Sequence, residues 1–206
     1  MSGDQVVLAS NNAKKLAELR RILEPLLPGI EVLGLADFPA YDEPAETEPT
    51  FEGNALIKAR ACLAATGLPS LADDSGLCVD ALNGMPGVLS ARWSGVAKSD
   101  GGDAANNALL LNQLSDVPDN RRTAQFRCAV ALCLPGGDER VEHGEMAGRI
   151  LHEEHGGGGF GYDPLFAADG HDVSTAELPP GEKDRISHRG KALVAIVPAV
   201  VEALGT

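Results

Sequence analysis

The chain has 206 residues, and its 17 lysines and arginines against 30 aspartates and glutamates give a formal net charge of −13. So acidic a chain is a poor partner for DNA, RNA or an anionic membrane, because each of these needs clustered cations. Hydrophobic residues make up 44% of the sequence, so we expect a single domain over residues 1–206 with a substantial core.

The sequence carries no mark of export or of membrane insertion. Its first residues include no basic stretch followed by an apolar run, and no run of about 18 apolar residues occurs. The cysteines, which form no Cys-x-x-Cys pair, are Cys62, Cys78, Cys128 and Cys133. We therefore expect reduced, mostly buried thiols in a cytoplasmic protein that has no membrane partner.

The first half of the chain alternates strand-like and helix-like patterns. The expected elements are strands at 6–9, 30–33 and 70–80 and helices at 16–26 and 51–65, with an acidic, proline-punctuated loop over 39–50. This alternation predicts a mixed α/β fold.

The second half begins with a loop-rich stretch over residues 83–103 and a helix expected over 104–114. Residues 123–134 have a period of two that predicts a strand, with one face formed by Phe126, Cys128, Val130, Leu132 and Leu134. Residues 139–146 can return beside it as a hairpin. We place a second lobe near 104–148. The last expected helix covers 190–204, where Pro198 predicts a kink or a break.

The first candidate site is the segment Ser10-Asn11-Asn12-Ala13-Lys14-Lys15, where the first strand gives way to the first helix. The free N–H groups of a helix start attract anions, and a lysine in the first turn adds a full charge. This pattern favours phosphate binding. The alternative is that Ser10 or Asn12 is an ordinary N-cap.

The second candidate site is Asp73-Asp74-Ser75-Gly76. Adjacent acids can hold Mg²⁺, which prefers oxygen ligands and keeps several waters. In an extended segment, neighbouring side chains point to opposite faces, so one aspartate would face the site while the other is structural. Glu46 and Glu52 lie upstream as further oxygen ligands. Acids in an ordinary turn are the alternative.

Two further segments have an unusual composition. Residues 156–164 formally satisfy G-x-G-x-x-G, but no buried strand precedes them and no helix follows, so we interpret them as a loop that presents Phe160 and Tyr162 to a planar base. Residues 183–189 gather scarce cations into a possible anion contact. The alternative for residues 156–164 is a mobile surface loop, and the alternative for residues 183–189 is a solvated basic patch.

In this order, the segments resemble the inosine triphosphate pyrophosphatase family, which acts on noncanonical purine nucleoside triphosphates. The blocks that carry the resemblance are residues 7–15, 50–55, 71–77, 90–92, 159–164, 182–183 and 187–190. They extend over nearly the whole chain, and their joint order is specific where each block alone is not.

The resemblance implies an elongated mixed-sheet α/β fold of two lobes with a central substrate cleft, usually as a homodimer. It implies Mg²⁺-dependent hydrolysis of ITP, dITP and XTP to the monophosphate and pyrophosphate. By position, Asp74 would be the proton acceptor and a metal ligand, Glu46 a second metal ligand, and Ser75 a substrate contact. The remaining substrate contacts that it implies are Ser10, Asn11, Asn12, Ala13, Lys14 and Lys15 at the phosphates, and Phe160, Gly161, Tyr162, Asp163, Lys183, His188 and Arg189 around the nucleoside.

Two departures from the family pattern leave questions open. Asn11 stands where many members have glycine, and Gly53 stands where many have a second glutamate, so either Glu46 or Glu52 could help to hold the metal. Two other functions also remain open. One is a nucleotide pyrophosphatase of the septum-formation-inhibitor type, acting on pyrimidine or modified nucleotides, and the other is a nucleotide sensor without turnover.

Overall fold

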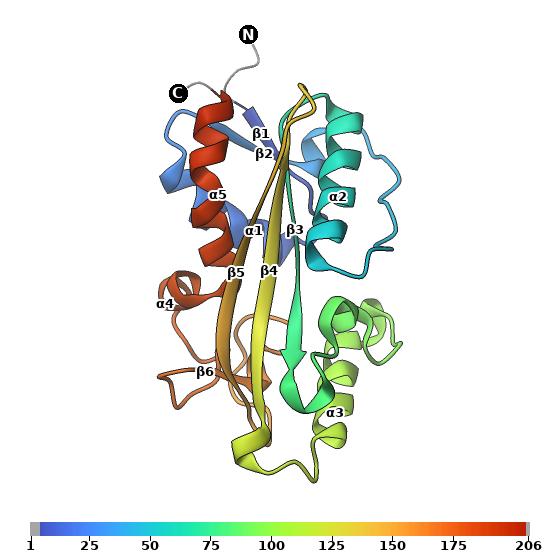
Figure 1. Cartoon of the computed structure of the whole chain (residues 1–206), viewed down its shortest axis with the longest axis vertical. Coiled ribbons are helices and arrows are strands. Elements are labelled where there is room, and N and C mark those ends of the chain that lie inside the picture. Colours follow the sequence, from blue (N-terminus) through green and yellow to red (C-terminus); the bar gives the residue numbers. More distant parts are fainter. Residues whose placement is uncertain (1–4, 205–206) are drawn as a thin grey trace. The chain divides into compact units, whose positions relative to one another are not determined.

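The computed structural model describes residues 5–204, apart from the side chains of Lys14 and Lys98. The strands are β1 (Gln5–Leu8), β2 (Glu31–Gly34), β3 (Ser70–Val79), β4 (Thr123–Cys133), β5 (Glu139–Ile150) and β6 (Phe166–Ala168). The helices are α1 (Ala13–Leu23), α2 (Phe51–Thr66), α3 (Gly102–Gln113), α4 (Pro180–Ile186) and α5 (His188–Leu204) (Figure 1).

The strands form one six-stranded sheet in the order β2-β1-β3-β4-β5-β6. β1 pairs in parallel with β2 and with β3, where Val7 lies opposite Ser70, whereas β5 and β6 are antiparallel. Parallel and antiparallel pairs in one sheet with helices beside it confirm the predicted mixed α/β class.

Contacts divide the chain into two compact units. Unit 1 comprises Met1–Asp74, Cys128–Gly144 and His188–Thr206, and unit 2 comprises Ser75–Arg127 and Glu145–Ser187. Strands β3, β4 and β5 contribute residues to both units. Residues 104–148, where we expected a second lobe, are therefore shared between the two.

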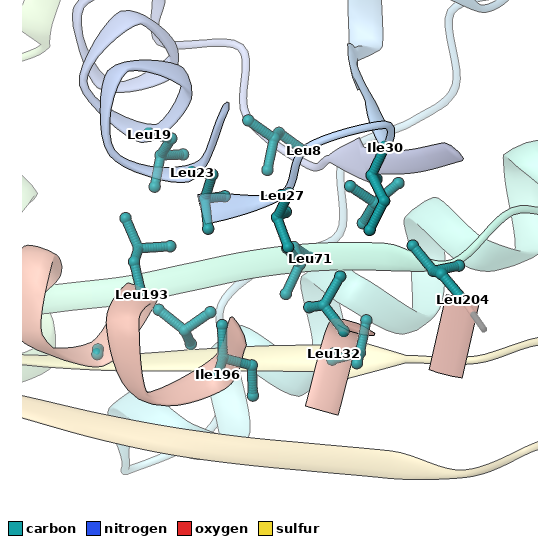
Figure 2. Packing of buried hydrophobic residues seen from close by; sticks show 14 of the residues in the cluster. Leu8, Leu19, Leu23, Leu27, Ile30, Leu71, Leu132, Leu193, Ile196 and Leu204 are labelled. Atoms are coloured by element: carbon teal, nitrogen blue, oxygen red, sulfur yellow. The ribbon is translucent and has the colours of Figure 1, made fainter. Parts of the chain in front are cut away.

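Unit 1 has a helical layer on each face of its strands. Alternate residues of β4, such as Val130 and Leu132, join a leucine-rich core with α1 and α5 (Figure 2). The intervening residues, such as Ala131, join a second cluster with α2 that consists largely of alanines. Small residues let α2 approach the sheet closely, which matters for the site described below.

Unit 2 has its own core, built from β3, α3, β4, β5 and β6. Within this core, the ring centroids of Phe126 and Phe166 lie 4.8 Å apart in an edge-to-face arrangement. Phe126 continues the alternation of β4, as the sequence predicts.

Three features differ from the sequence-based expectations. Of the kink or break predicted at Pro198, the break does not occur, because α5 continues through this residue. Pro198 lies on the exposed face, as does Val194, whose carbonyl loses its partner and can be hydrated instead. The strand expected over 139–146 continues to Ile150, and both β6 and α4 were not predicted. Over residues 5–204, no helix is both long enough and apolar enough to cross a membrane.

Candidate active site

The segment 10–15 forms the turn and the N-terminus of α1. Asn12 caps the helix, because its side-chain oxygen accepts a hydrogen bond from the Lys15 N–H at 3.3 Å and its carbonyl accepts one from Leu16 at 2.8 Å. The Ser10 hydroxyl oxygen accepts a bond from the N–H of Asn12 at 3.3 Å. Ala13 begins the helix, and the side chain of Lys14 lies outside the described residues.

Asn11 reaches away from this turn toward the acidic loop. Its side-chain amide donates a hydrogen bond to Glu43 at 3.2 Å, and both residues are exposed. A polar side chain thus connects the segment 10–15 to the loop that also carries Glu46. Asn11 serves this contact through its amide, which glycine at the same position would lack.

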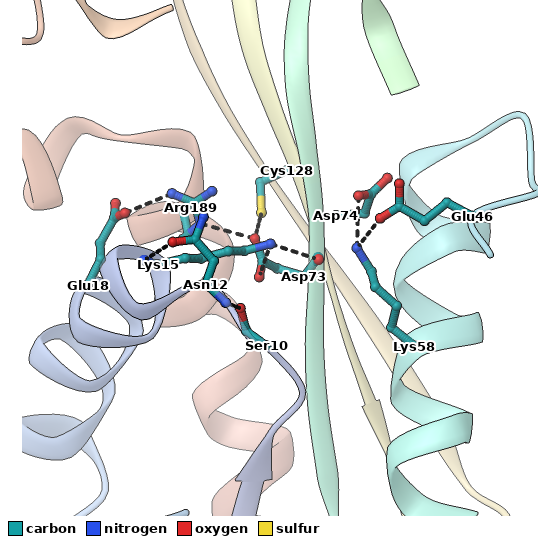
Figure 3. Close-up of polar contacts among 10 residues, drawn as sticks. All are labelled: Ser10, Asn12, Lys15, Glu18, Glu46, Lys58, Asp73, Asp74, Cys128 and Arg189. Carbon is teal, nitrogen blue, oxygen red and sulfur yellow. Dashed lines mark hydrogen bonds and ion pairs between the residues drawn. The ribbon is translucent and has the colours of Figure 1, made fainter. Parts of the chain in front are cut away.

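Asp73 and Asp74 point to opposite faces of β3, as their place in a strand predicts (Figure 3). Asp73 lies on the side of α1 and α5, and Asp74 lies on the side of α2. Both carboxylates are buried. The two acids therefore have different partners.

Asp73 is held by two cations. Lys15 Nζ lies 2.8 Å from Oδ1, and Arg189 Nε lies 3.0 Å from Oδ2. Burial alone would raise the pKa of the Asp73 carboxyl, but Lys15 and Arg189 outweigh it and hold this pKa well below its usual range. Asp73 is thus ionised at every physiological pH, and it fixes Lys15 at the first turn of α1.

Arg189 is buried in the same group of charges. Its Nη1 lies 2.8 Å from Glu18 Oε2, and the side chain is only 5% exposed. Burial would lower the pKa of Arg189, but Asp73 and Glu18 raise it above the usual value. The structure therefore shows Arg189 holding two carboxylates. Its contact with a base, and that of the buried neighbour His188, remain predictions.

Asp74 belongs to a separate group centred on Lys58. Lys58 Nζ lies 2.9 Å from Asp74 Oδ1 and 2.8 Å from Glu46 Oε1, and the side-chain amide of Asn54 donates to Asp74 Oδ2 at 3.3 Å. Burial raises the pKa of Asp74, and the nearby Glu46 adds to this, while Lys58 opposes it without cancelling the rise. The result is a buried carboxylate that takes up a proton more readily than an exposed aspartate.

The sequence interpretation assigned no role to Lys58 or Asn54. Both lie on the buried face of α2, four residues apart, and that face is otherwise made of small residues such as Ala55 and Ala59. A lysine on the apolar face of a helix is rare unless its charge is paired. That position is the clue that could have identified Lys58 in advance.

Glu46 and Asp74 form a donor set that fits Mg²⁺. Within residues 5–204, no three His, Cys, Asp or Glu side chains lie close enough to hold a metal by themselves. Mg²⁺, however, is usually bound by one or two carboxylates, with water and substrate phosphates completing its shell. Glu46 and Asp74 already converge on one cationic group, whereas Glu52 is exposed in the first turn of α2.

In unit 2, the loop at 159–163 and Lys183 are held together by Asp163. Its Oδ2 accepts hydrogen bonds from the Phe160 N–H at 2.8 Å and from Lys183 Nζ at 2.5 Å, and its Oδ1 accepts one from the Thr175 hydroxyl at 3.0 Å. Lys183 Nζ also lies 5.6 Å from the centroid of the Phe160 ring. At Gly159, a Cβ would collide with Asp163 and Lys183, so only glycine fits.

The two aromatic residues of the loop differ in exposure. Phe160 is partly exposed, but Tyr162 is only 4% exposed, and its hydroxyl donates a hydrogen bond to the Ser90 carbonyl at 3.0 Å. Tyr162 therefore anchors the loop in the interior of unit 2. Of the two rings, only Phe160 is placed to lie against a base.

The Ham1 family model matches residues 6–199, nearly the full chain. The chain belongs to the Ham1 family. This membership confirms the resemblance found in the sequence. A dITP/XTP pyrophosphatase of Nocardia farcinica is 61% identical over 201 residues, which cover 97% of this chain and 96% of that protein.

Two solved structures from other species are also similar to this Ham1-family chain. One is the nucleoside-triphosphatase, or dITP/XTP pyrophosphatase, of Mycobacterium abscessus, with 56% identity, a TM-score of 0.76, and coverage of 94% of this chain and 99% of that one. The other is a HAM1 protein of Coxiella burnetii, with 40% identity, a TM-score of 0.84, and coverage of 97% and 99%.

Proposed function

We propose that this Ham1-family chain is a cytoplasmic pyrophosphatase that hydrolyses ITP, dITP and XTP to the monophosphate and pyrophosphate. The observation that carries the proposal is the convergence of Glu46 and Asp74 on Lys58 Nζ, at 2.8 and 2.9 Å. It occurs in a chain 61% identical to a dITP/XTP pyrophosphatase. Removing such nucleotides would keep them out of nucleic acid synthesis.

Glu46 and Asp74 are the residues that we assign to Mg²⁺. When bound, this ion would offset phosphate charge and help to orient the phosphates for displacement. Lys58 supplies a positive charge to the same two carboxylates, so they can approach each other without the repulsion of two unpaired acids. Lys58 is 8% exposed, which keeps this charge poorly screened by water.

Asp74 would accept the proton of the attacking water. The water oxygen forms a bond to the α-phosphorus, the bond from that phosphorus to the bridging oxygen breaks, and pyrophosphate leaves with that oxygen. The proton passes to the carboxylate of Asp74. Because burial and Glu46 raise the pKa of Asp74, its carboxylate is a stronger base than that of an exposed aspartate.

The first turn of α1 would bind phosphate oxygens through its N–H groups and through Lys15, whose side chain is 16% exposed. The purine base would be recognised by the loop at 159–163, through the partly exposed Phe160 ring and the backbone beside it. Lys183, held by Asp163, adds a cation near that ring. A hydrogen-bond donor in the site would select the 6-oxo group of hypoxanthine and xanthine, which accepts the bond. Adenine has a 6-amino group at this position, which cannot accept it.

The test is a panel of ITP, dITP, XTP, GTP, ATP, dUTP and TTP with Mg²⁺, with the products identified. Release of pyrophosphate and monophosphate from ITP, dITP and XTP supports the proposal, and release of orthophosphate and diphosphate refutes it. A preference for dUTP or TTP would favour the septum-formation-inhibitor type. Binding without turnover would make the chain a sensor.

Asp74→Asn tests the proposed base in the same assay. We expect kcat to fall by about two to four orders of magnitude while the fold is kept, because general base catalysis is worth about that much. Asp116→Asn is a matched control, since Asp116 is an exposed aspartate of the same chain. Turnover by Asp74→Asn close to that of the control would remove Asp74 from this role.

We also expect a homodimer, as the family resemblance implies. Light scattering coupled to size-exclusion chromatography measures the mass in solution. The mass expected for the dimer is twice the 21.4 kDa of the chain. A single 21.4 kDa species at assay concentration would refute the dimer without affecting the proposed reaction.

A further inference from the structure

Two side chains of α3 hold the backbone of the loop at 159–163. The Asp103 carboxylate accepts a hydrogen bond from the Gly161 N–H at 3.1 Å, and the Asn107 side-chain amide donates one to the Gly161 carbonyl at 3.2 Å. The two residues lie one turn apart on the helix, so they share a face. Together they hold the peptide groups on both sides of one residue.

Gly161 is a point where the loop would otherwise be free to move. Its φ is +61°, a left-handed conformation that glycine adopts without strain but that most residues avoid. It lies between Phe160, the partly exposed ring, and Tyr162, the buried anchor. A rotation at Gly161 would therefore shift the peptide group beside Phe160 while Tyr162 stayed in place.

Apart from Asp103 and Asn107, the contacts described here hold the neighbours of Gly161 and not Gly161 itself. The Phe160 N–H is fixed by Asp163 at 2.8 Å, and the Tyr162 hydroxyl is fixed by the Ser90 carbonyl at 3.0 Å. Asp103 and Asn107 hold the N–H and the carbonyl of Gly161, which lies between these two contacts. All of these residues belong to unit 2.

We propose that Asp103 and Asn107 are positioning residues for base recognition, which set the selectivity of the enzyme without touching the substrate. The proposal rests on the proposed function, because it assigns the loop at 159–163 to the base. Hydrogen-bond discrimination between a 6-oxo and a 6-amino purine requires a donor held in one place. A loop that can shift by about 1 Å accepts both.

The first experiment measures base selectivity as the ratio of kcat/KM for ITP to that for ATP. For Asp103→Ala and Asn107→Ala we expect this ratio to fall about tenfold or more, mainly through a higher KM for ITP, because remote positioning errors of this size cost such factors. Asn112→Ala is the matched control, since Asn112 is an exposed asparagine of the same helix. Unchanged ratios in both variants would overturn the proposal.

A conservative variant separates positioning from charge. Asp103→Asn keeps a side-chain oxygen that can accept the Gly161 N–H. We expect it to recover most of the selectivity that Asp103→Ala loses. If Asp103→Asn is as unselective as Asp103→Ala, the hydrogen bond to Gly161 is not what matters, and the proposal fails for Asp103.

Asn107→Leu separates positioning from stability. The side-chain oxygen of Asn107 is buried and has no hydrogen-bond partner among the described residues, so a leucine of similar size removes an unsatisfied polar atom along with the contact to Gly161. We expect Tm to be equal to or higher than that of the wild type while selectivity falls. A lower Tm with unchanged selectivity would make Asn107 a structural residue only.

Hydrogen exchange tests the contact between Asp103 and Gly161 without relying on the proposed reaction. The Gly161 amide should exchange about tenfold faster or more in Asp103→Ala than in wild type or Asn112→Ala, because the local opening energy falls when its acceptor is lost. Unchanged exchange would refute the contact even in an active enzyme. If the wild type hydrolysed no nucleotide, the proposed function would fail, while the exchange result would still report on the contact.

Discussion

Arg189 offers the sharpest test of how the buried charges of unit 1 act. Its side chain is 5% exposed, and its guanidinium binds Asp73 at 3.0 Å and Glu18 at 2.8 Å. Arg189→Met replaces it with an apolar side chain that still fills space, and leaves Glu18 and Asp73 without this partner. Removing one partner from a buried ion pair costs about 3–5 kcal/mol. For a chain of this size, that corresponds to a fall in Tm of about 6–20 °C.

Arg60→Met is the matched control for burial. Arg60 forms a two-pronged ion pair with Glu139, at 2.6 and 2.7 Å, but its side chain is 55% exposed. Exposed pairs contribute about 1 kcal/mol or less, so we expect its Tm to fall by about 4 °C at most. Calorimetry of both variants at pH 7 makes the comparison. Equal losses would refute the reasoning from burial.

A second substitution, Glu18→Gln, tests whether the stability lost in Arg189→Met comes from a carboxylate left without its cation. In the Arg189→Met background, Glu18 is a buried carboxylate whose cation has been removed, so neutralising it with Glu18→Gln should not destabilise the protein further. We expect the double variant to be at least as stable as Arg189→Met alone. If Arg189 acted mainly by contacting the base, its removal would change the ITP-to-ATP selectivity and leave Tm nearly unchanged.

Three further predictions concern the other charged groups. Lys15→Ala should raise the KM for ITP with a smaller effect on kcat, since it removes a proposed phosphate contact; an unchanged KM in steady-state assays would exclude this role. Lys58→Met should lower kcat by about two orders of magnitude or more, because it removes the cation between two carboxylates; wild-type turnover by a folded variant would contradict this. The low pKa of Asp73 stabilises the fold above about pH 4, and this contribution is lost as the pH falls further. Asp73→Asn should therefore show a flatter decline of the unfolding free energy between about pH 4 and 2, by up to about 1.4 kcal/mol per pH unit, in urea titrations.

Local patterns predicted much of the fold. The alternation of β4 placed Val130 and Leu132 in one core, and the strand period placed Asp73 and Asp74 on opposite faces. The elements that were missed have little local pattern: β6 spans three residues, and α4 spans seven and begins at a proline. Such short segments are fixed by neighbours that are distant in the sequence.

The sequence named candidate site residues, which remain predictions, but it named neither Lys58 nor Asn54, and it did not predict how the charges pair. The contact between Arg189 and Asp73 joins residues 116 positions apart, and no periodicity carries that information. Lys58 had a local clue, its place on the apolar face of α2, yet its two carboxylate partners could be assigned only in three dimensions. Sequence motifs named candidate residues and left open which of them neutralise one another.

That pairing changes what the net charge of −13 implies for the substrate. Three of the cations assigned to the triphosphate or the nucleoside already contact carboxylates. Lys15 contacts Asp73, Lys183 contacts Asp163, and Arg189 contacts both Asp73 and Glu18. A nucleoside triphosphate with about four negative charges would therefore meet cations whose charge is largely offset, so a divalent ion has to supply the balance. We expect an ITP analogue with a non-hydrolysable α,β-bridge to bind the wild-type chain in calorimetry with Mg²⁺ and to lose about tenfold or more in affinity in EDTA. Equal affinity in EDTA would mean that these cations release their carboxylates at little cost, which would contradict the burial and distances on which this inference rests.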